Sequence, residues 1–598
     1  MPTASLEDVT WNLEHLVDDE GPDGVERLLE EAAGKASAFA ERHAGKVAQL
    51  DGPGLAAAMD ELATIHDLAG RAGNYAALLF SADTSDPAHG ALMQKAEERG
   101  TTIETDLLFF ELEWAAVEDA KADELLEAEG LENYRHFLKQ VRIYRPHLLS
   151  EPEERILTEK NITGRSAWGR LFSELMSAVE VQLPGHDEPV QMEVATSQLM
   201  HPDREVRQGA QEAITKALEP GLRTRAFIFN TLLHDKAVDD RLRHYPTWLS
   251  SRNLSNEASD ESVEALVQAV QSNYDIPQRW YRIKAGLLGV DKLADYDRMA
   301  PVTTEDEEFA WDDACGLVLD AYESFSPELG SLVRQFFDEE WIDAPVRPGK
   351  RGGAFCAYTV PSVHPYVLLN YTSRRRDVLT LAHELGHGVH AALARPRGPF
   401  EMGTPLTLAE TASVFGETIV FGRLLDAAPS AESRLGLLAE SLEGSIATVF
   451  RQVAMNRFEH AIHTARREQG ELSVDQINGF WVASQNDLMG DSVEVTDNYK
   501  SWWSYVPHFV GTPGYVYAYA YGQLLALSVY ARYLEEGEPF VPRYLDMLRS
   551  GGSKSPEELG ELVGIDLADP GFWDNGLQLV RTQLEKAEAA AAEAGGAA

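Results

Sequence analysis

Residues 376–390 read Arg-Asp-Val-Leu-Thr-Leu-Ala-His-Glu-Leu-Gly-His-Gly-Val-His. Apolar residues recur in this stretch at three- and four-residue spacing, which predicts a buried helix. On that helix His383 and His387 lie one turn apart on the same face, so both imidazoles can reach one point. Glu384 is turned about 100° from His383 and can reach a water molecule there without binding an ion. The pattern is typical of a zinc site.

A catalytic zinc site needs a third protein ligand and an open fourth position. Residues 407–417 read Thr-Leu-Ala-Glu-Thr-Ala-Ser-Val-Phe-Gly-Glu, a second apolar helix that carries two acids. Because a buried carboxylate needs a cation or hydrogen-bond donors, we predict Glu410 as the third ligand. Glu417 lies two turns further on and is predicted to orient a ligand histidine. The alternative is that the two histidines are structural and that both acids are solvated.

A third segment with polar chemistry covers residues 505–522. It carries His508 and four tyrosines, Tyr515, Tyr517, Tyr519 and Tyr521. Hydrolysis of an amide creates an oxyanion, which neutral donors such as a tyrosine O–H or a histidine N–H stabilise. On a helix the first and third tyrosines share one face and the second and fourth share another, so the sequence leaves open which faces the ion. The alternative is that all four only pack.

Composition limits the classes of partner. The chain has 598 residues, of which 44% are hydrophobic and 25% charged, as in ordinary globular proteins. Its formal net charge is 52 − 97 = −45, which disfavours nucleic acids and anionic membrane surfaces as partners. There is no apolar run of transmembrane length and no secretory signal pattern. Two cysteines fit a reducing compartment, so we predict a cytoplasmic protein.

Amphipathic helix dominates the rest of the chain, with few strands. A hairpin is expected over 179–194, and two further β-like runs over 353–360 and 366–371 follow a basic, mobile-looking loop at 347–353. The histidines His460 and His463 lack a neighbouring acid with an open site and are predicted to be structural. The helices expected in the first part of the chain span 24–48, 54–80, 88–118, 122–141, 151–160 and 165–178.

We predict three parts along the chain. An N-terminal helical domain, including the hairpin, covers residues 1–200, and a metallopeptidase-like catalytic domain covers 201–585. An Ala-rich tail covers 586–598 and is expected to fray because of its low complexity. The fold class is mainly α.

Together the motifs resemble the zinc metallopeptidases of the oligoendopeptidase F and thimet oligopeptidase family, and most closely the oligoendopeptidase F branch. The resemblance covers nearly the whole chain and ends before the Ala-rich tail. Besides the two helices described above, it is carried by Trp11-Asn-Leu-Glu-His-Leu16, Phe80-Ser-Ala-Asp-Thr-Ser-Asp-Pro87, Thr163-Gly-Arg-Ser-Ala-Trp168, Gly349-Lys-Arg-Gly-Gly-Ala-Phe355, Leu368-Leu-Asn370 and Gly551-Gly-Ser553.

The resemblance implies a two-lobed helical ellipsoid with a deep channel and a small β-sheet beside a zincin-type helix. It further implies endopeptidase action on short unfolded peptides, with one zinc ion per chain. We expect a monomer or a small homo-oligomer. The rival hypothesis is a peptidyl-dipeptidase or metallocarboxypeptidase of similar helical fold, which would need a fixed cation for the C-terminal carboxylate of its substrate. A peptide-binding scaffold without catalysis is a further alternative.

The resemblance also implies roles for single residues. Zinc would be held by His383, His387 and Glu410, and Glu384 would be the general base that activates the zinc-bound water. The oxyanion would be stabilised by zinc with His508 and Tyr515. Substrate-binding residues would be Gly353, Ala354, Phe355, Tyr519 and Tyr521. The chain departs from the thimet branch between the histidine and the first tyrosine, where Pro513 intervenes and the spacing differs.

Overall fold

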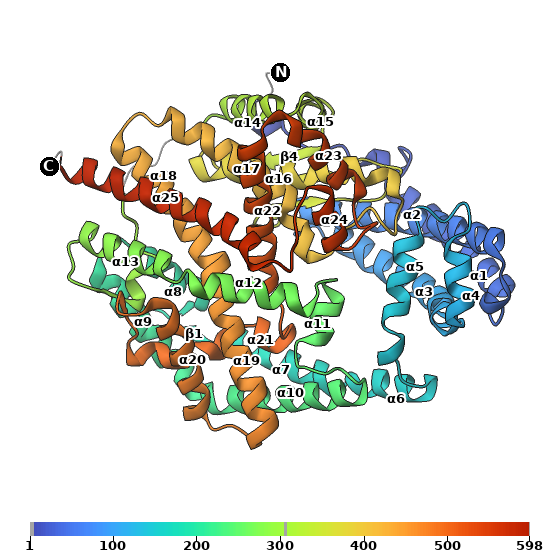
Figure 1. Ribbon diagram of the computed structural model, residues 1–598, viewed down its shortest axis with the longest axis horizontal. Coiled ribbons are helices and arrows are strands. Elements are labelled where there is room, and N and C mark those ends of the chain that lie inside the picture. The colour runs from blue at the N-terminus through green and yellow to red at the C-terminus, as the bar shows by residue number, and fades with distance from the viewer. Residues whose placement is uncertain (1–4, 304–307, 597–598) are drawn as a thin grey trace. The chain divides into compact units, whose positions relative to one another are not determined.

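The computed structural model describes residues 5–303 and 308–596. It is 72% helical and its strands form only small sheets, which confirms the predicted mainly α fold (Figure 1). The chain divides into two compact units, each built from three separate segments. Within the described ranges, no helix combines the length and apolar character needed to cross a membrane.

The first unit comprises Met1–Pro146, Asp306–Asp426 and Arg532–Ile565. Its apolar core joins the N-terminal helices to residues of the central sheet, such as Tyr366 and Leu368, which are fully buried. Its main helices are α1 (Gly21–His43), α2 (Gly52–Ala82), α3 (Pro87–Ala116), α4 (Asp119–Leu126), α5 (Arg135–Ile143), α14 (Trp311–Phe325), α15 (Pro327–Asp338), α16 (Arg375–Ala394), α17 (Leu406–Ala427), α23 (Val541–Ser550) and α24 (Pro556–Leu562).

The second unit comprises His147–Glu305, Ala427–Ala531 and Asp566–Ala598. Long helices from all three segments pack together, and α25 lies against α12, α13 and α18. Its main helices are α6 (Glu151–Asn161), α7 (Arg165–Ser177), α8 (Met192–Ser197), α9 (Arg204–Leu218), α10 (Leu222–Leu242), α11 (Ser250–Ser255), α12 (Asp260–Ser272), α13 (Asp275–Leu287), α18 (Ala431–Ser445), α19 (Arg451–Gln469), α20 (Val474–Met489), α21 (His508–Gly511), α22 (Tyr517–Glu536, which runs on into the first unit) and α25 (Pro570–Gly596).

A three-stranded sheet leads into α16 in the first unit. Its order is β4 (Ile342–Pro345), β6 (Tyr366–Tyr371) and β5 (Phe355–Ala357). The antiparallel β5–β6 pair confirms the two runs expected from sequence, with Phe355 opposite Leu368. The parallel strand β4 was not expected, because pairing between distant segments leaves no local sequence pattern.

The basic loop before β5, which looks mobile in the sequence, is hydrogen-bonded at several points. Thr84, just after α2, donates from its N–H and its hydroxyl to the Gly349 carbonyl, at 2.7 and 2.8 Å. The Asn370 amide donates to the carbonyls of Arg351 and Gly353, at 2.9 and 2.8 Å. Thr84 from the N-terminal segment and Asn370 from β6 therefore hold the backbone that enters β5.

Three other expectations are refined by the structure. The single helix expected over 122–141 is two helices, α4 and α5, because the chain turns at Gly130 with a φ of +90°. The hairpin is antiparallel as expected but short, pairing β1 (Glu180–Val181) with β2 (Val190–Gln191), and α8 begins directly after it. In the segment expected to fray, α25 continues to Gly596.

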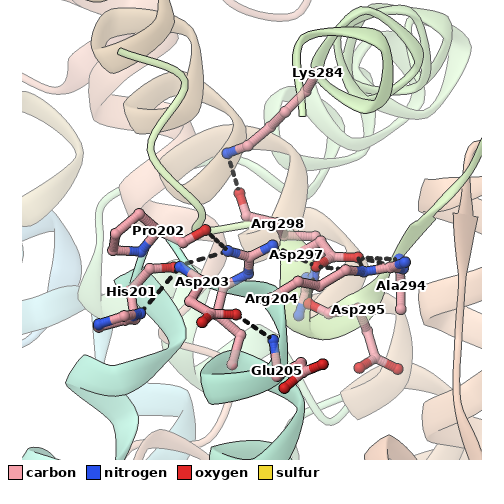
Figure 2. Close-up of polar contacts among 11 residues, drawn as sticks. His201, Pro202, Asp203, Arg204, Glu205, Lys284, Ala294, Asp295, Asp297 and Arg298 are labelled. Atoms are coloured by element: carbon pink, nitrogen blue, oxygen red, sulfur yellow. Dashed lines mark hydrogen bonds and ion pairs between the residues drawn. The ribbon is translucent and has the colours of Figure 1, made fainter. Parts of the chain in front are cut away.

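A buried polar network organises the start of α9 in the second unit (Figure 2). The fully buried Asp297 carboxylate accepts hydrogen bonds from Arg204 and Arg207 and from the Ala294 backbone N–H, at 2.8 to 2.9 Å in the shortest contact with each. Nearby, the Lys284 ammonium donates to the Arg298 carbonyl at 2.7 Å. Such pairing is what allows a charged carboxylate to stay in the interior.

Candidate active site

The helix that carries the paired histidines, α16, begins with a firm cap. One carboxylate oxygen of Asp377 accepts from the backbone N–H groups of Thr372 and Arg374, at 2.7 and 3.0 Å. The bond to Arg374 runs from the N-cap residue to the acid in the first turn and satisfies a donor at the helix start. Leu381 and Leu385 on the opposite face are fully buried, which fixes the rotation of the helix. The His383 and His387 rings lie 5.0 Å apart between centroids.

Glycines let α17 approach α16 closely enough to deliver its acid. A Cβ atom on Gly386 would lie 2.5 Å from the Ala412 carbonyl oxygen and 2.5 Å from the Ser413 Cα. A Cβ atom on Gly416 would collide with the Tyr322 hydroxyl. The two helix backbones are therefore in direct contact at this crossing, which no larger residue would allow.

At this crossing the three predicted ligands come together. His383, His387 and Glu410 each offer one ligand atom, and these atoms all lie within 4.8 Å of one another. Oε2 of Glu410 lies 3.3 Å from His383 Nε2 and 3.7 Å from His387 Nε2. The Ser413 hydroxyl donates to the same oxygen at 2.7 Å, an orienting contact that the sequence analysis missed.

Glu417 contacts the first histidine from the other side. Its Oε2 lies 3.2 Å from His383 Nδ1, as expected for a carboxylate that fixes the ring and leaves Nε2 free for a metal ion. Burial alone would lower the pKa of His383, but Glu417 and Glu410 outweigh it and raise that pKa to about 9. The two carboxylates thus strongly favour a positive charge at the position of His383.

Glu384 lies on the same helix as the two histidines but is not one of the three clustered ligand residues. Its side chain is only 7% exposed, and burial raises its pKa to about 7. The imidazole of His383 and the backbone amide of Cys356 in β5 oppose that shift. A carboxylate with a pKa near neutrality can both accept and return a proton.

Of the predicted substrate-binding residues, Gly353 and Ala354 lead into β5 and Phe355 is its first residue. In the sheet order β4, β6, β5, this strand has a strand partner on one side only among residues 5–303 and 308–596. The geometry leaves a sheet edge on the β5 side, and extended peptides bind to such edges through main-chain hydrogen bonds.

Three other predicted residues form a cluster of their own in the second unit. Nε2 of His508 lies 3.2 Å from the Tyr519 hydroxyl. The ring of Tyr515 stacks on His508 with centroids 5.8 Å apart and packs edge-on against Tyr519 at 5.0 Å. Burial lowers the pKa of His508, so its neutral form is favoured.

The other two tyrosines are interior residues. Tyr517 and Tyr521 are fully buried. The Tyr517 hydroxyl accepts from the Asn256 amide at 3.0 Å, and the Tyr521 hydroxyl donates to Ser262 Oγ at 3.3 Å. The substrate contact predicted for Tyr521 does not fit this burial. Of the four, only Tyr515 and Tyr519 keep part of their surface exposed.

Known proteins share both sequence and fold with this chain. The sequence profile of Peptidase family M3 matches residues 197–579, and the Oligopeptidase F profile matches residues 113–180. Oligopeptidase PepF of Bacillus subtilis is 27% identical over 87% of this chain and 78% of its own length. Group B oligopeptidase PepB of Streptococcus agalactiae is 27% identical over 86% of each chain.

Solved structures have the same fold. A crystal structure from Chlamydophila abortus has a TM-score of 0.88 at 22% identity and covers 98% of this chain and 99% of its own. The oligoendopeptidase-F structure from Enterococcus faecium has a TM-score of 0.71 at 23% identity, covering 94% of this chain and 98% of its own. Since the family profile spans more than half of the sequence, the chain belongs to peptidase family M3 and is a hydrolase of peptide bonds.

Proposed function

We propose that this chain is a zinc-dependent endopeptidase that cleaves internal bonds of short, unfolded oligopeptides. One observation carries the proposal: the ligand atoms of His383, His387 and Glu410 lie within 4.8 Å of one another, with Glu384 on the same helix as the histidines. The oligopeptidase names of the relatives support the substrate class.

The donor set fits zinc. Two imidazoles and one carboxylate are a common three-ligand set for catalytic zinc, and the fourth position is left to water or substrate. The carboxyl groups of Glu410, Glu417 and Glu384 all act on His383. This accumulation of acidic groups also favours a bound cation. When bound, zinc would lower the pKa of a water molecule and polarise the scissile carbonyl.

The protein's own groups handle the protons. Glu384 accepts a proton from the attacking water molecule while the oxygen of that water bonds to the scissile carbon. The same carboxyl then returns that proton to the amine nitrogen as the carbon–nitrogen bond breaks. His508 and Tyr515 donate hydrogen bonds to the oxyanion, a role that rests on the motif resemblance and on their neutral N–H and O–H groups. The free side of β5 pairs with the peptide backbone.

Digestion of a mixed peptide library tests the activity. We expect internal cleavage of short peptides, lost on adding a chelator and restored by zinc, as read by mass spectrometry. Peptides with a free and an amidated C-terminus should be cleaved at similar rates. A strong preference for the free acid would contradict the endopeptidase assignment and favour the peptidyl-dipeptidase or metallocarboxypeptidase alternative.

Glu417 offers a test of the orienting contact. Replacing it with alanine should weaken zinc binding by about 10- to 100-fold, as is usual when a partner of a ligand histidine is lost. Glu417→Gln keeps an oxygen that can accept from His383 Nδ1 and should retain most of the affinity. Zinc competition titration measures both variants. Unchanged affinity in the alanine variant would show that Glu417 does not orient the histidine.

A further inference from the structure

The turn that precedes α22 is anchored by a buried acid. The Gly514 backbone N–H donates to Oε1 of Glu459, which comes from α19, at 2.9 Å. Glu459 is 1% exposed, and its Oε2 is buried without a hydrogen-bond partner in residues 5–303 and 308–596. A carboxyl group in the interior is costly unless it is hydrogen-bonded. The bond from the Gly514 N–H therefore offsets part of the cost of burying Glu459.

Gly514 has no room for a side chain on the side of the turn that faces Trp248 and Leu249. Gly514 has a φ of +76°, a conformation that side chains rarely adopt. A Cβ atom at this position would lie 2.7 Å from Leu249 Cδ1 and 3.4 Å from Trp248 Cζ3. The backbone of the turn therefore rests directly on the residues that lead into α11.

Arg252 links the acid to the tyrosine ring. Its guanidinium carbon lies 6.0 Å from the centroid of Tyr515, within the range of a cation–π contact. Burial raises the pKa of Glu459 to about 8. The Gly514 N–H and the cations of Arg252 and Lys236 oppose that shift, so the same guanidinium acts on both the carboxyl and the ring.

We propose that Glu459 is a positioning residue for Tyr515: it holds the Gly514 backbone so that the next residue presents its phenol stacked on His508. The inference rests on the proposed function, in which Tyr515 stabilises the oxyanion. It gives a role to the Glu-His-x-x-His segment of α19, whose histidines the sequence predicts to be structural. In keeping with that prediction, His463 stacks on Trp248 at 4.5 Å.

Steady-state kinetics on the full chain test this role. Glu459→Ala should lower kcat by about 10- to 100-fold, since a misplacement of about 1 Å costs rates of this order. KM and zinc content should stay the same. Glu459→Gln retains an oxygen that can accept from Gly514 N–H and should restore most of kcat. An alanine variant with wild-type kcat, or a glutamine variant as slow as the alanine one, would overturn the inference.

A double-mutant cycle separates positioning from other effects. In a Tyr515→Phe background, Glu459→Ala should cause no further loss of kcat, because the positioned hydroxyl is already gone. If Glu459→Ala lowers kcat in the Tyr515→Phe background by the same factor as in the wild-type chain, Glu459 does not act through Tyr515. The role of Tyr515 itself would remain intact. Full activity of Tyr515→Phe alone would overturn the role of Tyr515 and with it this inference. If Glu459→Ala does not fold, Glu459→Asp takes its place in the cycle with the same expectations, because its shorter side chain withdraws the acceptor from the Gly514 N–H.

Asn230 provides a matched control. It is 3% exposed, and its amide bonds both the N–H and the carbonyl of Leu472, each at 2.8 Å. It is thus a buried side chain that clamps a backbone turn at the far end of α19, away from Gly514. Asn230→Ala should lower the melting temperature and leave kcat unchanged. If Glu459→Ala behaves in the same way, its role is structural and the inference fails.

Discussion

Replacing Glu384 by glutamine is expected to lower kcat by about 10²- to 10⁴-fold while one zinc ion per chain is retained. The amide has nearly the shape of the carboxyl group but cannot accept the proton of the attacking water. Metal content should not change, because the ligand cluster consists of His383, His387 and Glu410. Cleavage of a quenched peptide, together with metal analysis of the same sample, measures both quantities.

Glu401 supplies the control for that substitution. It is a second buried glutamate of the first unit, and its Oε1 accepts from the backbone N–H groups of His136 and Phe137 at 2.9 and 3.3 Å. Glu401→Gln keeps this acceptor and should leave turnover unchanged. If Glu384→Gln cleaves at the wild-type rate, Glu384 is not the general base.

Replacing Glu410 by alanine is expected to remove both metal and activity. Only two imidazoles would remain, and the Ser413 hydroxyl would lose the oxygen that it orients. Since losing a mere partner of a ligand costs about 10- to 100-fold in metal affinity, losing the ligand should cost at least about 100-fold. Zinc analysis and peptide cleavage, with and without added zinc, check this result.

The chelated wild-type enzyme is the reference for the Glu410 variant. It should recover its activity when stoichiometric zinc is returned, whereas Glu410→Ala should not recover at that concentration. A variant that keeps a full complement of zinc and full activity would exclude Glu410 as a ligand and leave the third position to another residue.

Local sequence patterns predicted the parts of the site that lie on single helices. The i, i+4 spacing places His383 beside His387 because helix geometry alone determines it. Glu410 could be predicted because its apolar neighbours make an unpaired acid there unfavourable. The structure brings these residues together as expected.

Contacts between distant segments could not be predicted in this way. Gly386 has no sequence pattern of its own, yet it allows the backbone of α17 to touch α16. The partner of Glu459 is a backbone N–H, which every residue except proline offers. Likewise, helical periodicity divided the four tyrosines into two faces, but only the packing of Tyr517 and Tyr521 shows which face is interior.

The packing beneath α17 has a consequence for how this protein is made. Tyr544 of α23 stacks on Phe415 of α17, with ring centroids 4.5 Å apart, so part of the support for the Glu410 helix comes from a residue more than a hundred positions later. A ribosome completes the metal-ligand helices long before it adds that support. A translation product that stops before residue 541 therefore lacks this aromatic contact, and the packing of the Glu410 helix is completed only when the last part of the first unit has been made.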